Sequence, residues 1–141
     1  MKMKFNFGIL KDKIVNFEYE YDGRMVGHYG KLIKIKEKKG TYKFTFSNGI
    51  VLEIKDTVLS KMIIRKDNDK IVFTYSKEPN LLSGLIGFSM ADTYGFPLEI
   101  TKEILDEDGF KIDVEGYNVL KELQKEKSSG TFVNKDGWNS K

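Results

Sequence analysis

The chain has 141 residues, of which 40% are hydrophobic and 13% aromatic, a composition that can build a hydrophobic core of moderate size. It contains no Cys and one His, which excludes disulfides and thiol chemistry. No apolar run approaches the ~20 residues that span a bilayer, and the start has no apolar stretch of signal-peptide length. We therefore expect a cytoplasmic protein that does not contact membranes.

The net charge of +3 is distributed unevenly along the chain. Residues 1–78 carry 17 Lys and Arg against 10 Asp and Glu, a net of +7, whereas residues 79–141 have a net charge of −4. This asymmetry predicts two modules, and the excess positive charge of the first is typical of a nucleic-acid binder. The alternative interpretation is that lysines simply solvate the surface.

Residues 1–78 show the period-two alternation of strands with one buried face, as in the run from Val15 to Tyr21. Asp22-Gly23 and Asn48-Gly49 favour tight hairpin turns because these residues tolerate positive φ. We expect five to seven short antiparallel strands here. Exposed edges would favour aggregation, so a small barrel or curled sheet is the expected arrangement.

Three lysines alternate with isoleucines in this module. On a strand Lys34, Lys36 and Lys38 would project from one face with a spacing of about 6.6 Å, which suits contacts to successive phosphates of a nucleic acid. They are the candidate residues for binding the phosphate backbone of an RNA. Edge-strand lysines that prevent aggregation are the alternative.

A helical piece is expected over residues 79–127, after Pro79 interrupts the strands. Three short helices are predicted, with Asn80 capping the first, Pro97 as the first residue of the second, and Asp113 capping the third. From Ser128 to Lys141 no apolar period remains, which predicts a disordered tail. The fold class is therefore α+β.

Asp92-Thr93-Tyr94-Gly95-Phe96-Pro97-Leu98 is the most specific motif in the sequence. It resembles a segment of the alanyl-tRNA synthetase family, in which the tRNA-recognising helical domain runs towards the editing part. The resemblance continues through about residues 82–127 and leaves the first 78 residues unmatched. It implies a shared RNA-facing piece, but not the family's catalysis, because aminoacylation needs a core of several hundred residues and editing needs a zinc site with Cys and several His ligands.

The resemblance assigns a role to Asp92, whose family counterpart helps to read the G·U pair of the tRNA acceptor stem. A carboxylate accepts hydrogen bonds, so it can recognise a guanine amino group in the shallow groove of A-form RNA. The alternative is that Asp92 only caps a turn between helices. We expect Tyr94, Gly95, Phe96 and Pro97 to hold that turn together.

The favoured hypothesis is a non-catalytic protein that binds tRNA or a tRNA-like structured RNA. We expect no catalytic residues, no cofactor and no metal ion, since no triad, phosphate-binding glycine loop or regular ligand spacing is present. The alternative is a protein-interaction or structural module that reuses the helical piece as a scaffold, with another protein or a second copy of itself as its partner.

Overall fold

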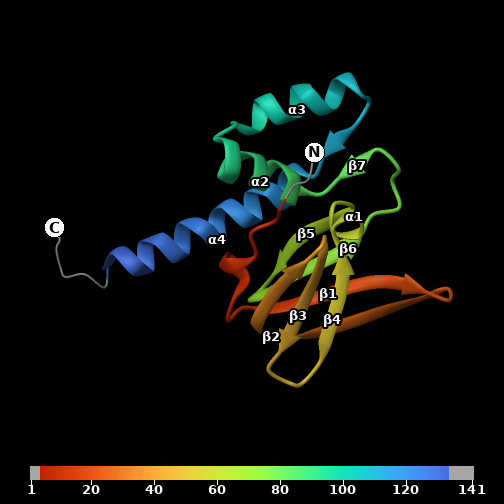
Figure 1. Ribbon diagram of the computed structural model, residues 1–141, viewed down its shortest axis with the longest axis vertical. Helices are drawn as coiled ribbons and strands as arrows, with labels where there is room; N and C mark the ends of the chain where they lie inside the picture. Colours follow the sequence, from red (N-terminus) through yellow and green to blue (C-terminus); the bar gives the residue numbers. More distant parts are fainter. Residues whose placement is uncertain (1–3, 134–141) are drawn as a thin grey trace.

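The computed structural model describes residues 4–133, which have the predicted α+β architecture (Figure 1). The strands are β1 (Ile14–Tyr21), β2 (Arg24–Lys38), β3 (Thr41–Phe46), β4 (Val51–Lys55), β5 (Met62–Asp67), β6 (Lys70–Tyr75), β7 (Leu81–Leu82) and β8 (Lys111–Ile112). The helices are the 3-10 turn η1 (Gly8–Leu10) and the α-helices α1 (Asp56–Leu59), α2 (Gly84–Tyr94), α3 (Leu98–Glu107) and α4 (Val114–Val133).

Six strands form one open sheet in the order β4-β3-β2-β1-β6-β5, so the sheet curls without closing into a barrel. The expectation of a purely antiparallel module was wrong at one pair, because β1 and β6 run parallel. The reason lies in the connection. After β4 the chain crosses through α1 to β5 at the opposite edge, and the β5–β6 hairpin then places β6 beside β1.

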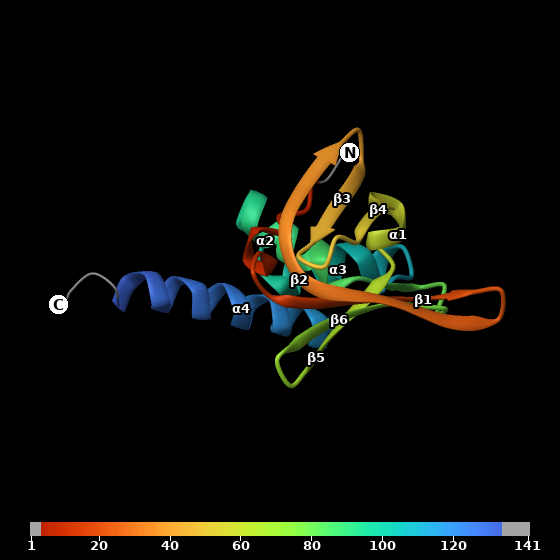
Figure 2. The ribbon, with the colours of Figure 1, turned by 90° about the horizontal axis from the view of Figure 1, so that it is seen from below.

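Strand β2 joins the two halves of the sheet. Its first half pairs with β1 and its second half with β3, and Figure 2 shows it bending from one half towards the other. Both halves therefore face one core, in which the ring of Phe17 lies 4.8 Å from that of Phe44 and 4.9 Å from that of Phe73 between centroids. Aromatic packing of this kind contributes stability beyond the area that it buries.

The helices complete this core instead of forming a separate one. Leu85 and Phe88 of α2 and Leu120 and Leu123 of α4 belong to the same buried cluster as the phenylalanines of the sheet. In Figure 1, α2 and α3 lie at one end of the sheet, and α4 passes beneath them and extends outwards. Residues 1–78 and 79–127 differ in charge, but they are joined by shared burial.

Helix boundaries differ from the sequence prediction at three places. Ser83, not Asn80, caps α2, because its Oγ accepts a hydrogen bond from the backbone N–H of Leu85. Pro97 lies one residue before α3, in extended backbone, instead of being its first residue. Helix α4 runs to Val133, past Ser128 where the tail was expected to begin, and residues 134–141 of that expected tail lie outside the described residues.

Among residues 4–133, no helix combines the length and the apolar composition that crossing a bilayer requires.

Candidate nucleic-acid interface

Five exposed lysines lie on the outer face of β2, β3 and β4, and we call them the lysine face: Lys34, Lys36, Lys38, Lys43 and Lys55. From Lys34 onwards, successive side chains of these strands alternate between the core and solvent. Ile35 and Phe44 pair across β2 and β3 and point into the core, so their neighbours along each strand point away from it. The structure thus places the three predicted lysines on one solvent-facing surface and adds Lys43 and Lys55 to them.

A β-bulge determines which side chains of β2 reach this face. Leu32 pairs with Phe46 and Lys34 with Thr45, so Ile33 is an extra residue without a partner on β3. A bulge reverses the alternation of a strand. Leu32 and Ile35 can therefore both face the core, while Lys34, Lys36 and Lys38 all face solvent.

The charges of the lysine face are unbalanced. Lys36 lies directly opposite Lys43 in the β2–β3 ladder, and the next residue across, on β4, is Glu53. None of the five lysines forms an ion pair with another residue of the described range. Like charges placed directly opposite each other destabilise a sheet, so this arrangement leaves a local excess of positive charge on the face.

The turn between β2 and β3 holds the lysine face in register. Lys39 and Gly40 both have positive φ, at 52° and 82°, as a tight hairpin turn requires. The backbone N–H of Gly40 donates to Glu37, and the carbonyl of Gly40 accepts from the N–H of Asp56 at the start of α1. The turn is therefore tied to the end of the edge strand β4.

Asp92 lies on the last turn of α2, and its side chain is exposed. It makes no hydrogen bond or ion pair with any other residue between 4 and 133, so its carboxylate does not cap the following turn. The turn is made by Gly95, whose φ is +71° and whose N–H donates to the carbonyl of Ala91. The rings of Tyr94 and Phe96 pack against each other with their centroids 5.8 Å apart, and Tyr94 is 48% exposed.

The structure does not bring Asp92 and the lysine face together on one concave surface. The lysines project from the outer face of the curled sheet, whereas α2 packs on the core side through Leu85 and Phe88. A ligand that touches both must reach around the edge of the sheet.

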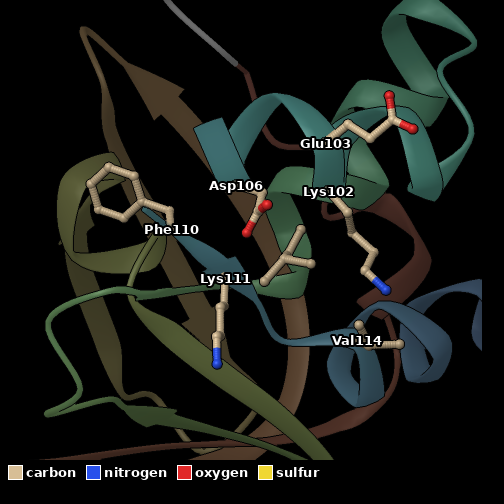
Figure 3. A pocket seen from close by; sticks show the side chains of 7 residues that line it. Lys102, Glu103, Asp106, Phe110, Lys111 and Val114 are labelled. Atoms are coloured by element: carbon tan, nitrogen blue, oxygen red, sulfur yellow. The ribbon is translucent and has the colours of Figure 1, made fainter. Parts of the chain in front are cut away.

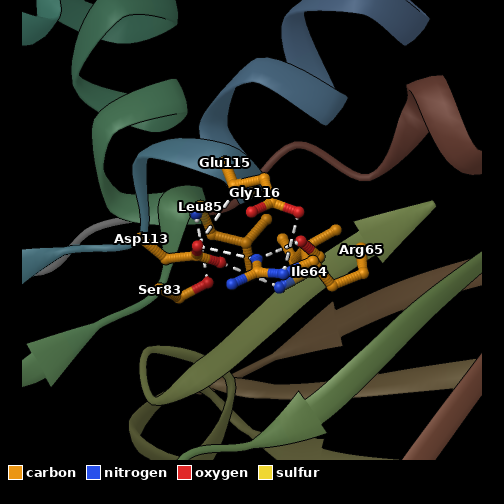
Figure 4. A network of polar contacts seen from close by, with 7 residues as sticks. All are labelled: Ile64, Arg65, Ser83, Leu85, Asp113, Glu115 and Gly116. Atoms are coloured by element: carbon orange, nitrogen blue, oxygen red, sulfur yellow. Dashed lines mark hydrogen bonds and ion pairs between the residues drawn. The ribbon is translucent and has the colours of Figure 1, made fainter.

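A polar network joins the helices to the edge strand β5 (Figure 4). The buried carboxylate of Asp113 accepts hydrogen bonds from the N–H of Ile64 at 2.9 Å, from Nη1 of Arg65 at 2.7 Å and from the N–H of Gly116 at 3.2 Å. Arg65 Nε also contacts Glu115 at 3.1 Å. The sequence predicted the helix cap, but nothing in it indicated the partner on β5, which is 48 residues away in sequence.

A surface pocket of about 460 Å³ lies between α3 and the start of α4 (Figure 3). Lys102, Asp106 and Lys111 contribute charges of both signs to its rim, and Phe110 and Val114 contribute apolar surface. Across residues 4–133 no group of three His, Asp or Glu side chains is arranged to hold a metal ion. The mixed charge of this pocket does not distinguish one class of ligand.

The described residues thus form a mostly antiparallel sheet with a positively charged outer face, attached to a helical layer. The comparisons are more specific. The family model of tRNA synthetases class II (A) matches residues 69–139, and the chain belongs to this family. The match begins at Asp69, before β6, so it includes about ten residues that the sequence motif had left unmatched.

The matched relatives are alanine–tRNA ligases. The enzyme of Clostridioides difficile (strain 630) is 40% identical over 70 residues, which are 50% of this chain and 8% of that protein. The enzyme of Prochlorococcus marinus (strain MIT 9515) is 52% identical over 48 residues, 34% of this chain and 5% of that protein. The enzyme of Acholeplasma laidlawii (strain PG-8A) is 37% identical over 84 residues, 53% of this chain and 10% of that protein.

The chain thus spans a tenth or less of the length of these relatives, and its second half is an alanyl-tRNA synthetase-family segment. No solved structure matches the chain.

Proposed function

We propose that this chain is a non-catalytic RNA-binding member of the alanyl-tRNA synthetase family, and that its ligand is tRNA or a structured RNA that resembles it. The observation that carries the proposal is the pairing of Lys36 with Lys43 on an exposed sheet face without compensating ion pairs. The family supports the same class of ligand, since the relatives are named as ligases of tRNA.

Phosphate contacts supply the binding energy in this proposal. Five lysines on one face can replace the counterions of several phosphates, and their release drives association at low salt. Such contacts position an RNA without reading its sequence. Solvated lysines act here as point charges, so the role that we assign to the face is binding and not chemistry.

Asp92 is the proposed specificity residue. Its exposed carboxylate has no partner within residues 4–133, so its acceptor oxygens face solvent at the end of α2. A guanine amino group in the shallow groove of an A-form stem is a donor of suitable chemistry. Because Asp92 and the lysine face lie on different sides of the molecule, we expect affinity and specificity to respond to separate mutations.

The test is fluorescence polarisation of labelled tRNA at several salt concentrations. Lys36→Ala/Lys43→Ala should weaken binding and reduce the slope of log affinity against log salt by about 2, roughly one for each lysine that neutralises a phosphate. Lys121→Ala/Lys125→Ala removes the same charge from exposed positions on α4 and is the matched control. Equal effects of the two double variants would mean that net charge alone, and not the lysine face, attracts RNA.

A second candidate function is a protein-interaction module, and one observation favours it. Ile100 and Ile104 lie one turn apart on α3 and are 40% and 44% exposed, and Tyr94 is exposed close by in sequence. Exposed apolar side chains at this spacing suit contact with another protein surface. A stable dimer that is free of nucleic acid and dissociates on Ile100→Lys/Ile104→Lys substitution would support this alternative.

A further inference from the structure

One aromatic side chain stands on the same outer face of β2 as the lysines. Tyr29 is 59% exposed, and Nζ of Lys70 on β6 lies 6.0 Å from the centroid of its ring. Ile14 of β1 pairs with Lys31 of β2 on one side and with Lys70 of β6 on the other, so Lys31, Ile14 and Lys70 form a row across the three strands. An exposed tyrosine ring thus stands beside two lysines on the sheet surface.

The ring of Tyr29 is exposed, although polar side chains lie beside it. Gly27, its neighbour two residues earlier on the same face, has no side chain, and Asn16 and Glu18 of β1 fill the space over it, because a Cβ there would meet Asn16 Oδ1 at 3.2 Å and Glu18 Cγ at 3.7 Å. The Tyr29 side chain itself remains 59% exposed. The carbonyl of Tyr29 accepts a hydrogen bond from Nδ2 of Asn48, 2.8 Å away, which fixes the backbone beneath the ring. The position is therefore fixed at the main chain and open at the side chain.

A groove opens at the bulge, further along β2 from Tyr29. It has a volume of about 390 Å³ and lies between β2 and the N-terminal segment. Glu37 and the core-side residues Ile35 and Tyr42 line it together with Ile33, Lys34 and Lys11, so the groove borders the outer face of β2 and is not part of it. Ile33 is the bulge residue and is 41% exposed. The bulge presents an apolar side chain to the groove and keeps the lysines on either side directed to solvent.

We propose that the outer face of β2 binds an unpaired RNA segment, with one base stacked on Tyr29 and the following phosphates on Lys31, Lys34 and Lys36. The proposal rests on the proposed RNA-binding function and adds the kind of RNA. From Tyr29 to Lys38 the strand spans roughly 30 Å, a length that fits about four nucleotides.

The charges favour RNA over a protein partner on this face. The exposed apolar groups are separate, and each has a lysine nearby: Lys31 and Lys70 lie in the row of the sheet next to Tyr29, and Ile33 precedes Lys34. Alternation of aromatic rings and cations is the pattern of proteins that hold single strands, because each base stacks while its phosphate is neutralised.

The experiment compares two RNA probes against the full chain. One is a fluorescein-labelled oligoadenylate of about eight nucleotides, long enough for one sheet site; the other is a blunt RNA duplex of about twelve base pairs, which has no unpaired bases. Tyr29→Ala is the test variant and Tyr29→Phe retains a ring for stacking. Tyr21→Ala is the matched control, because Tyr21 is 69% exposed on the other face of the same hairpin.

We expect Tyr29→Ala to weaken oligoadenylate binding about 5- to 100-fold and to leave the affinity for the duplex unchanged. Tyr29→Phe should bind the oligoadenylate nearly as well as wild type, and Tyr21→Ala should have no effect. Unchanged oligoadenylate binding by Tyr29→Ala, or an equal loss in Tyr21→Ala, overturns the inference. A wild-type protein that binds labelled tRNA but not the oligoadenylate refutes the inference alone, whereas one that binds neither of them refutes the proposed function as well.

Discussion

Replacing Asp113 by Ala should separate the helices from the sheet. The carboxylate is buried, with 3% of its side chain exposed, and it holds three donors: the N–H groups of Ile64 and Gly116, and the guanidinium of Arg65. Each donor loses its acceptor in the variant. We therefore expect a large fall in the free energy of unfolding from a single substitution.

The magnitude follows from the burial of those donors. Leaving the N–H of Ile64 buried without an acceptor costs about 1–3 kcal/mol, and losing the cap of α4 costs about 1 kcal/mol more. The side chain of Arg65 is 39% exposed, so water screens its pair with Asp113 and losing that pair adds about 1 kcal/mol or less, which brings the total to about 2–5 kcal/mol. We expect a loss within that range for Asp113→Ala, and a smaller one for Asp113→Asn, which retains one acceptor oxygen.

Glu115→Ala is the matched control, because it removes the second carboxylate that contacts Arg65. The side chain of Glu115 is 70% exposed, so this pair is screened by water and should contribute about 1 kcal/mol or less. Urea unfolding followed by far-UV circular dichroism gives both values. If the two substitutions cost the same, the buried network does not hold α4 on β5, and the reasoning is wrong.

Three further predictions concern the core, the helix contact and specificity. Burial raises the pKa of Tyr42, and its hydroxyl accepts the N–H of Phe5 at 2.8 Å, so Tyr42→Phe should cost about 1–2 kcal/mol at neutral pH. Since the folded state holds that proton more tightly, the advantage of wild type over the variant should shrink as pH rises above about 10, as urea titrations at two pH values can show. Gly84→Ala should cost about 3 kcal/mol in the same unfolding assay, because its Cβ would meet the backbone N of Tyr117 at 2.3 Å; a gain in stability from helix propensity would contradict this. Asp92→Ala should lower the preference for a G·U minihelix over its G·C twin by about 1–3 kcal/mol in polarisation titrations, and a wild type without any preference would rule out the role of Asp92.

The local pattern of the sequence predicted most of the sheet. Alternation identified the strands, and Asn48-Gly49 marked the turn between β3 and β4. The parallel β1–β6 pair was missed because alternation shows which face a residue occupies, but not which strand lies beside it. The bulge at Ile33 was missed for a related reason, since a single extra residue within a run of Lys and Ile leaves the pattern almost unchanged.

Only part of the candidate site could be predicted from the sequence. Lys34, Lys36 and Lys38 were recognisable because they share one strand. Lys43 and Lys55 reach the same face only through the register of three strands, which depends on turns and core packing. One signal was available: Lys43 alternates with Tyr42 and Phe44, and an antiparallel hairpin about Lys39-Gly40 places it opposite Lys36.

The most direct test of the RNA-binding proposal is an NMR titration of the ¹⁵N-labelled chain with unlabelled tRNA. The proposal predicts that amide shifts concentrate on the sheet face, in residues 29–38, 41–45 and 51–55, with a second group around Asp92 at the end of α2, and that they vanish at high salt. Resonances of the α3 pocket around Phe110 should not move. Shifts centred on α3, or none at stoichiometric tRNA, would contradict the proposal that the sheet face binds RNA.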